Sequence, residues 1–506
     1  MEGTVLIHYS NPNDTIIFLL QNLLEMNRLW IRIQQISPKD KNRHRTDRKE
    51  LSVLVGENIF RLSSLESVDI EIYKTLVLPR FLALVYNCKD VYSQQYLMDI
   101  VIQVFPYEYH IRTVGILLEA CSGLHNLVDA GAIFIILMER LSNFFNLSKE
   151  IIEINKEVDI FSASKQFIDK MVKEQYEIAA LGKLMDLEIA LIKVCVKCYP
   201  DKIEHIEVVL DRSLNLVKKH PNAEEVANAL PKIAELLAIP LDSLTLVVIA
   251  MPSFSMLAEY LNTELKESLA KNLLKGLIKS RKKVESLEVV GKIVDYIKPL
   301  LENYSNKFYD ECELEDIQIH ISKLMHIMDL GGCEKEFAGL MKLNDIFTKS
   351  KLSLVEIAIQ SLVWALYKLA SKASNAAIEN QALQIDVFEK AYDLCEMLGK
   401  TRSEEALKLL LQGVNLLSLL RVEGEICTKL MSKVLSLYKD NVKLLTLIIG
   451  SLKQAQIFPK EKSVEYFKII IKLCNNLKNK EEQGKIFLQC THLVAAQENV
   501  SFNKYQ

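Results

Sequence analysis

The chain has 506 residues, half of them apolar and a quarter charged, with only 16 glycines and 11 prolines. This length exceeds a single compact core, and the composition is typical of long helices rather than of strands or disordered segments. A net charge of −3 at pH 7 excludes a general electrostatic attraction to nucleic acid or anionic lipid. We therefore predict no nucleic-acid partner.

The expected compartment follows from the cysteines. The ten cysteines lie mostly on apolar helical stripes at irregular spacings, as buried thiols do in a reducing compartment. Residues 1–11 show no secretory signal, and the longest uncharged run, residues 243–258, is too short for a transmembrane helix and contains Pro252. We expect a cytoplasmic protein whose membrane contacts are peripheral.

The first predicted helix covers residues 15–35, and Asn13 or Asp14 is its expected N-cap. The polar segment that follows, residues 37–50, reads SPKDKNRHRTDRKE and holds six basic residues. A phosphate-binding role is one interpretation of this run. Its acidic residues favour the other interpretation, a solvated connector.

Residues 87–112 predict a helix, a stop and a second helix. Apolar residues from Leu97 to Phe105 recur at helical spacing on a helix that starts near Asp90. Pro106 ends that helix, because proline lacks the N–H group and disfavours helical geometry in the preceding residue. A second apolar stripe runs from Ile111 to Cys121. Neither stripe can be buried by its own helix alone, so neighbouring pairs of the same kind are expected.

Helical stripes continue along the rest of the chain, and strand-like alternation is nowhere sustained. Five prolines divide residues 200–252, whereas none lies between Pro299 and Pro459, so longer helices are expected in that span. The further stripes cover residues 51–65, 72–86, 128–145, 160–171, 178–196, 317–328, 354–369, 387–398, 406–420, 426–438, 442–452, 464–477 and 486–494.

These stripes predict an all-α fold, a right-handed α-solenoid of about a dozen HEAT-like helix pairs. No consensus repeats at a fixed period, which disfavours ankyrin and tetratricopeptide arrays. Leu97 and Leu445 are expected in the core. By fold analogy, such an array holds other proteins on an extended surface.

Constellations that resemble catalytic or metal sites have simpler interpretations. The Gly399-Lys-Thr sequence lacks the second glycine of a phosphate-binding loop, and Gly399 is interpreted as a helix C-cap. Cys195 and Cys198 have the spacing of half a zinc site without a second pair, which favours core packing. We predict no enzyme activity, no cofactor and no metal site.

Several separate stretches of the chain, in order, match segments of one known protein family. Residues 54–66, LVGENIFRLSSLE, are similar to an LVG-x-N and RLS-x-LE segment. Residues 95–106, QYLMDIVIQVFP, with Glu108 and His110, are similar to an EYLM and IIQVFPDEFH segment. Shorter matches are KCYPD at 197–201, LQG at 411–413, SLY at 436–438, TLIIG at 446–450, and QG at 483–484 with Cys490, His492 and Leu493. Through these stretches the chain resembles the family of vacuolar protein sorting-associated protein 35, the helical scaffold subunit of the retromer cargo-sorting complex.

The resemblance implies a scaffold in protein sorting from endosomes to the Golgi or the cell surface, located on the cytoplasmic face of endosomal membranes. Residues 1–180 would be the middle of the solenoid and residues 181–506 its C-terminal, partner-binding half. The implied partners are the retromer subunit with a metallophosphoesterase fold and a second copy of the chain. The Pro-Arg-Leu-Tyr-Leu motif that binds the arrestin-like subunit does not occur, so that partner is not expected. The alternative is another helical-repeat transport adaptor, a coat or nuclear-transport solenoid.

The resemblance also selects candidate site residues. In the partner-binding half they are Gln412, Gly413, Thr446, Gln483 and His492. Glycine inside a helix costs about 1 kcal/mol relative to alanine, so Gly413 indicates close approach of another group, either a partner or a neighbouring helix. The other four have a plain alternative, as solvated side chains or, for His492, a core histidine.

Asp316 is the remaining candidate. It resembles an aspartate of a loop that the family uses in assembly or recruitment. Its alternative role is a charge near a helix start that complements the helix dipole.

Overall fold

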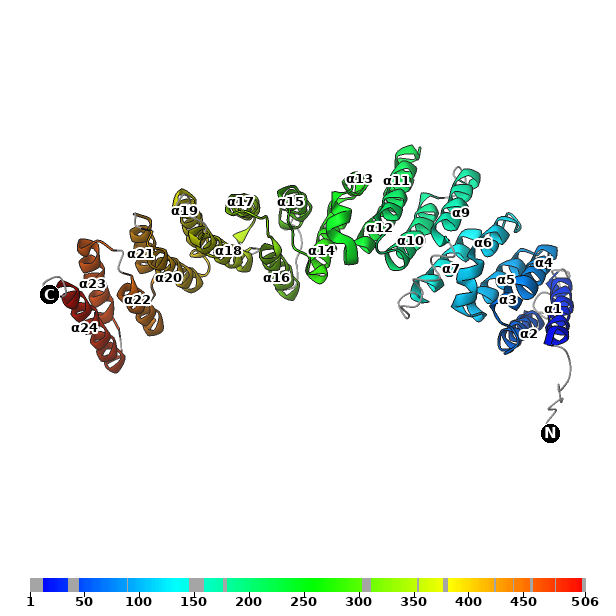
Figure 1. Ribbon diagram of the computed structural model, residues 1–506, viewed down its shortest axis with the longest axis horizontal. Helices are drawn as coiled ribbons and strands as arrows, with labels where there is room; N and C mark the ends of the chain where they lie inside the picture. The colour runs from blue at the N-terminus through cyan, green and yellow to red at the C-terminus, as the bar shows by residue number, and fades with distance from the viewer. Residues whose placement is uncertain are drawn as a thin grey trace, which may run out of the picture. The chain divides into compact units, whose positions relative to one another are not determined.

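The computed structural model describes residues 12–34, 45–88, 90–144, 159–175, 180–302, 311–352, 355–375, 381–422, 425–439, 441–455, 458–477 and 479–502. These residues are almost entirely helical, and within each part of the chain many neighbouring helices pack in pairs, such as α6 with α7 and α18 with α19 (Figure 1). The single β-type pairing in these ranges is an isolated parallel bridge between Val284 and Met328. The predicted all-α array of helix pairs is confirmed, and its right-handed sense stays a prediction.

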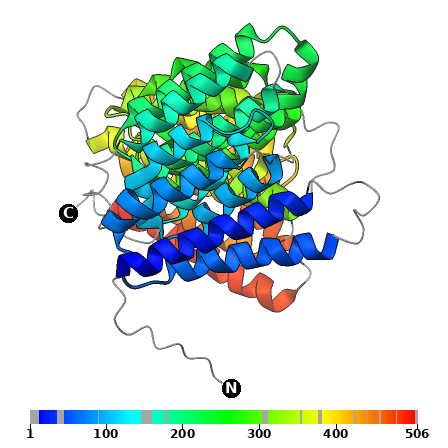
Figure 2. The same ribbon diagram turned by 90° about the vertical axis from the view of Figure 1, so that its right-hand side faces the viewer.

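The chain divides into two compact units, residues 1–240 with 251–261, and residues 241–250 with 262–506. The first unit contains α1 to α11, most of α12, and α13. In it α1 and α2 lie side by side, as Figure 2 also shows, and α2 packs on α5. Its elements are α1 (Pro12–Gln34), α2 (Arg45–Ser63), α3 (Ile70–Ile72), the π-helical η2 (Tyr73–Val77), α4 (Leu78–Asn87), α5 (Val91–Val104), α6 (Tyr107–Ser122), α7 (Ala130–Phe144), α9 (Ile160–Gln175), α10 (Leu181–Cys198), α11 (Ile203–Lys219), α12 (Ala223–Ala250) and α13 (Pro252–Tyr260).

The second unit contains the last turns of α12 and all later helices. Contacts between α14 and α15, α18 and α19, and α20 and α21 join neighbours in the chain, while α18–α20 and α20–α22 contacts join alternate helices. Its elements are α14 (Thr263–Ser280), α15 (Leu287–Glu302), α16 (Glu311–Ile327), α17 (Cys333–Lys349), α18 (Glu356–Asn375), α19 (Gln381–Leu398), α20 (Ser403–Leu420), α21 (Glu425–Leu437), α22 (Val442–Gln454), α23 (Lys460–Asn475) and α24 (Lys480–Phe502).

The helix, stop and helix predicted for residues 87–112 are confirmed. Asp90 caps α5, because its carboxylate accepts a hydrogen bond from the backbone N–H of Ser93 at 2.8 Å. Phe105 is the extended C-cap residue, and Pro106 precedes the first turn of α6. The Leu97 side chain of α5 is fully buried. The local sequence therefore sets both ends of the repeating unit.

Replacing Leu97 by alanine should destabilise the α5–α6 region by about 2–5 kcal/mol, because neighbouring pairs cannot close the cavity. Hydrogen exchange of the α5 amides measures this locally. Tyr92→Ala in the same helix is the matched control, since its side chain is 76% exposed and its loss should cost no more than about 0.5 kcal/mol. Equal effects of the two substitutions would contradict the predicted packing.

Two expectations about helix ends and lengths are wrong. Helix α1 begins at Pro12, so Asn13 and Asp14 lie within its first turn rather than at the N-cap. The longest uninterrupted helices in the described part of the chain are α1 and α24, with 23 residues each, and both lie outside the proline-poor span. Helix α12, which contains Pro231 and Pro240, consists of two helical stretches that meet at a kink. The kink lies at Leu244, which has non-helical dihedral angles (φ −122°, ψ 26°).

By length and composition alone, α12 is the one helix among the described residues that could cross a membrane. Its most apolar window has a mean hydropathy of 2.0, and 44% of that window is buried in the structure. This helix contains no uncharged run of transmembrane length, because it carries Asp242 and other charged residues. The core helix of a soluble protein passes the same compositional test.

Candidate partner-binding surfaces

Helices α18, α20 and α22 form one row within the second unit (Figure 1). Along this row three large apolar side chains remain in solvent: Trp364 of α18 is 49% exposed, Leu419 of α20 80% and Leu447 of α22 50%. All three lie off the buried stripes of their helices. We call this surface the Trp364 face. Solvent-exposed tryptophan and leucine side chains on adjacent helices are typical of a protein-binding surface.

A pocket of about 380 Å³ opens on the Trp364 face. Its lining is mostly apolar. The lining residues are Gln360, Trp364, Glu405, Lys408, Leu409, Leu411, Gln412, Asn415, Leu447 and Ser451. The Oδ1 atom of Asn415 is buried and accepts no hydrogen bond from the described residues. A buried acceptor without a donor is costly.

Of the predicted site residues, Gln412 is exposed and lies on this pocket. Gly413 is buried and faces the interior instead. A Cβ atom at position 413 would lie 2.5 Å from the Tyr367 hydroxyl oxygen and 3.0 Å from its Cζ atom. The structure thus supports the neighbouring-helix interpretation of Gly413, since its missing side chain makes room for Tyr367.

The other predicted site residues do not join this pocket. Thr446 is half-buried in α22, where its hydroxyl donates to the Val442 carbonyl at 3.0 Å. Gln483 lies at the start of α24 and donates to the carbonyl of Cys474 at 3.1 Å, which caps the end of α23. His492 belongs to α24, and its side chain lies outside the described residues.

Asp316 lies in the second turn of α16 rather than in a loop. Its side chain is exposed, and its backbone carbonyl contacts the His320 ring. The preceding segment, residues 303–310, lies outside the described residues. Glu311 begins the helix, so Asp316 sits one turn beyond the position at which a carboxylate best complements the helix dipole.

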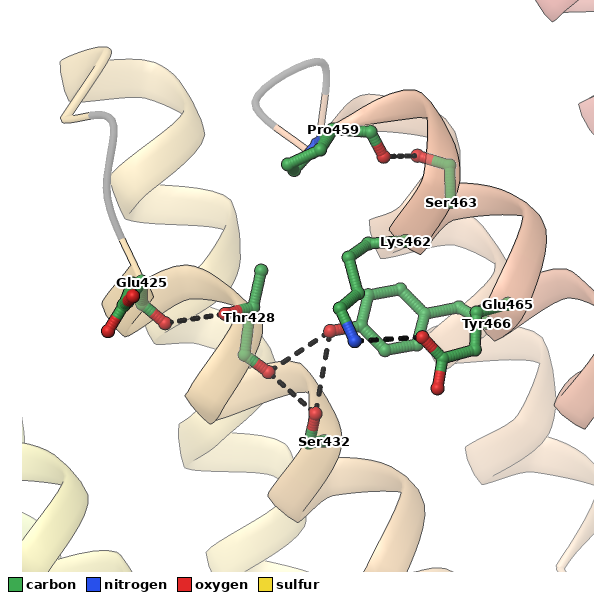
Figure 3. A network of polar contacts seen from close by, with 8 residues as sticks. All are labelled: Glu425, Thr428, Ser432, Pro459, Lys462, Ser463, Glu465 and Tyr466. Atoms are coloured by element: carbon green, nitrogen blue, oxygen red, sulfur yellow. Dashed lines mark hydrogen bonds and ion pairs between the residues drawn. The ribbon is translucent and has the colours of Figure 1, made fainter.

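Helices α19, α21 and α23 alternate in the chain with those of the Trp364 face, and a wider groove of about 1150 Å³ is lined by residues of all three. In Figure 3 the contacts of Tyr466 run from α23 to α21, whereas the other contacts drawn are local to one helix. The Tyr466 hydroxyl donates to the Thr428 carbonyl at 3.1 Å and lies 3.4 Å from the Ser432 hydroxyl. The lining residues are Ile385, Glu389, Tyr392, Glu425, Ile426, Thr428, Lys429, Ser432, Lys433, Ser436, Pro459, Lys462 and Tyr466.

The charges of this groove are largely compensated within the chain. Lys462 pairs with Glu465 at 2.8 Å, and the Lys429 ammonium lies 4.6 Å from the centre of the Tyr392 ring. Burial raises the pKa of Tyr466, so its hydroxyl is neutral at physiological pH and can donate the bond to α21. Polar contacts in the groove therefore join α21 to α23, and its surface exposes both acidic and basic side chains.

The residues considered for catalysis or metal binding have structural roles. Gly399 follows the last residue of α19, and its N–H donates to the Cys395 carbonyl at 2.9 Å, as a C-cap residue does. Cys195 and Cys198 are buried in α10, where burial raises the pKa of both thiols. No group of three or more metal-ligating side chains occurs among the described residues. Of the basic run, residues 37–44 lie outside that part, and residues 45–50 begin α2.

The comparisons with known proteins agree over nearly the whole chain. The family model for vacuolar protein sorting-associated protein 35 matches residues 6–505. Vacuolar protein sorting-associated protein 35B of Arabidopsis thaliana is 28% identical over 502 residues, which cover 95% of this chain and 63% of that protein. The 35C protein of the same plant is 29% identical with the same coverage, and the Dictyostelium discoideum protein 35 is 27% identical over 95% of this chain and 64% of its own length.

The chain thus spans a little under two thirds of the length of these relatives. Within that span the match is continuous, and it includes both helical units and both surfaces described above. Since one family model accounts for nearly every residue, this chain belongs to the vacuolar protein sorting-associated protein 35 family.

Proposed function

We propose that this chain is a non-catalytic scaffold subunit of a retromer-type sorting complex, acting in retrograde protein transport from endosomes. Family membership supports this role. The helical array supports it further, because stacked pairs give a long surface and few sites for chemistry. The proposed location is the cytoplasmic face of endosomal membranes, held there through other subunits. Co-localisation of a fluorescent fusion with an endosomal marker tests that location.

The subunit with a metallophosphoesterase fold is the proposed partner, and the Trp364 face is its proposed binding surface. The observation that carries this placement is the half-exposed pair of Trp364 and Leu447, which lie on the two helices that flank α20 in the second unit. Burial of such side chains in an interface is favourable by roughly 25 cal/mol per Å² of apolar surface removed from water. Nearby Gln412 supplies a polar rim.

Co-purification of the full chain from its own cells tests this function. The expected result is recovery of a metallophosphoesterase-fold protein at a stoichiometric level, and loss of that protein when Leu447 is replaced by aspartate. A charged group at this position would be buried without a partner in the interface. Leu127→Asp is the matched control, since Leu127 is exposed and belongs to the first unit.

Two other results would redirect the proposal. Recovery of a small GTPase or clathrin without the metallophosphoesterase-fold protein would favour a different transport adaptor. Turnover of a small-molecule substrate would favour an enzyme. The second proposed partner is another copy of the chain, and light scattering of the purified protein measures that association. We propose no arrestin-like partner for these residues, because the sequence lacks the corresponding motif.

A further inference from the structure

We infer that the exposed basic segment at the end of α14 binds a ligand that carries several adjacent phosphate groups, as an inositol phosphate does. The segment covers residues 275–283, which read KGLIKSRKK, and we call it the α14 basic segment. Arg281 and Lys282 make the direct contacts to the phosphates, and Lys275 extends the positive surface along the helix. The inference is independent of the proposed function, because its test needs no other subunit.

Two cations of the α14 basic segment are paired within the chain. Lys283 lies 2.7 Å from a carboxylate oxygen of Asp329. Lys279 lies 3.4 Å from Asp242, and the two side chains of that pair are 67% and 70% exposed, so solvent screens their attraction. Only the first of these pairs has a close contact that holds its cation in place.

The other three cations are available to a ligand. Lys275, Arg281 and Lys282 are exposed, and none of them has an ion pair among the residues that the structure describes. They lie within eight positions of one another in a protein whose net charge is −3. Positive charge that the chain leaves unpaired in so short a segment attracts an anion with several charges close together.

The backbone at Arg281 indicates a role for its side chain. Arg281 is the C-cap residue of α14 and has φ 50° and ψ 16°, in the left-handed region where glycine is the usual residue. No hydrogen bond of its side chain to another described residue offsets this strain. The dipole of α14 accounts for Lys279 in the last turn, but its effect falls off beyond that turn.

Contacts with the α16–α17 connection hold the turn that follows Arg281. The Val284 N–H donates to the Ile327 carbonyl at 3.0 Å, and the Asp329 N–H donates to the Val284 carbonyl at 3.0 Å. These two bonds form the isolated parallel bridge between Val284 and Met328. The position of Arg281 is therefore fixed before a ligand arrives, and binding costs little ordering of this turn.

The surroundings favour phosphate groups over a protein partner. No large apolar side chain is exposed between residues 262 and 302, so this surface lacks the apolar anchors on which protein interfaces depend. The planar guanidinium of Arg281 matches the spacing of phosphate oxygens, and Lys282 adds a second charge beside it. Adjacent phosphates on one small molecule can engage both cations together.

Calorimetry of the full chain with inositol hexakisphosphate tests this site. Arg281→Gly should weaken the affinity about 10-fold or more, because it removes charge-assisted hydrogen bonds to phosphate. The same substitution should leave the melting temperature unchanged or raise it, since glycine adopts a φ of 50° without strain. Loss of affinity without loss of stability distinguishes a ligand contact from a structural role. Unchanged affinity of Arg281→Gly would overturn the inference.

Arg421→Gly is the matched control. Arg421 is the exposed C-cap residue of α20 and has a φ of 52°, so the substitution removes the same charge and the same backbone strain elsewhere in the second unit. The affinity for inositol hexakisphosphate should not change. Equal weakening by Arg281→Gly and Arg421→Gly would show that binding reflects net charge alone, and it would overturn the site.

Vesicles distinguish the two sources of such phosphates. Sedimentation of the full chain with phosphatidylcholine vesicles that contain phosphatidylinositol bisphosphate measures binding to a lipid headgroup. Vesicle binding that Arg281→Gly abolishes would support the site with a lipid as its ligand, and binding of inositol hexakisphosphate alone would support it with a soluble ligand. Binding of neither at physiological ionic strength would overturn the inference, as would tighter binding of a polyglutamate peptide than of inositol hexakisphosphate.

Discussion

Glu188→Ala is expected to destabilise the region of α9, α10 and α11 by about 3–5 kcal/mol, because it leaves the Arg212 guanidinium buried without its main counter-charge. Glu188 has no solvent exposure, and its carboxylate accepts two hydrogen bonds from Arg212, at 2.5 and 2.8 Å. Arg212 also reaches Asp169 of α9 at 3.1 Å. Three helices are therefore joined at one cation.

Burial raises the pKa of the Glu188 carboxyl, and the Arg212 guanidinium opposes that shift. The desolvation of both charges is thus a large cost that only the pairing offsets, so removing one member is worse than removing both. Glu188→Leu combined with Arg212→Leu should recover most of the lost stability. If this double substitution is as damaging as Glu188→Ala, the buried charge is not the cause.

Hydrogen exchange is the appropriate measurement, because unfolding of a helical array need not be two-state. Amides of α10 and α11 should exchange roughly 100-fold faster or more in Glu188→Ala. Glu235→Ala supplies the control. Its ion pair with Lys193, at 3.2 Å, is half-exposed, and its loss should cost no more than about 1 kcal/mol.

The fold could be predicted from the sequence because the signals for each helix lie within the helix and at its ends. Apolar spacing gave the helices, and Asp90 and Pro106 gave the ends of α5 within one residue. The length of α12 could not be predicted in this way. Proline removes one backbone N–H, but whether the helix breaks or bends depends on neighbours such as α14 that lie far away in the sequence.

The candidate surface was predicted only in part. Gln412 lies on the Trp364 pocket, whereas Trp364, Asn415 and Leu447 were not singled out. A signal for two of them exists in the sequence, because Trp364 and Leu447 are apolar residues that fall between the buried positions of their stripes. Asn415 carries no such signal. Its significance arises from an unpaired buried oxygen, which depends on three-dimensional packing.

Gly276→Ala is expected to destabilise the α12–α14 contact by at least about 3 kcal/mol, the upper range for an overpacked site. A Cβ atom at position 276 would lie 2.0 Å from the backbone carbonyl oxygen of Leu241 and 2.8 Å from Thr245 Oγ1. The Thr245 hydroxyl also donates to the Leu241 carbonyl, next to the bend at Leu244. The added methyl group therefore meets backbone, which cannot rotate away as a side chain can.

The control for this prediction is Gly450→Ala in α22, where a Cβ has open space and the substitution should stabilise the helix by about 0.5–1 kcal/mol. The two variants make the same chemical change and are expected to have opposite signs, so helix propensity cannot explain both. Amides of α14 should exchange roughly 100-fold faster in Gly276→Ala. Adding Thr245→Ala to Gly276→Ala tests the cause of the destabilisation. It removes only the more distant of the two contacts, so it should restore little of the lost stability. Full rescue by Thr245→Ala would show that the hydroxyl, rather than the Leu241 carbonyl, sets the need for glycine.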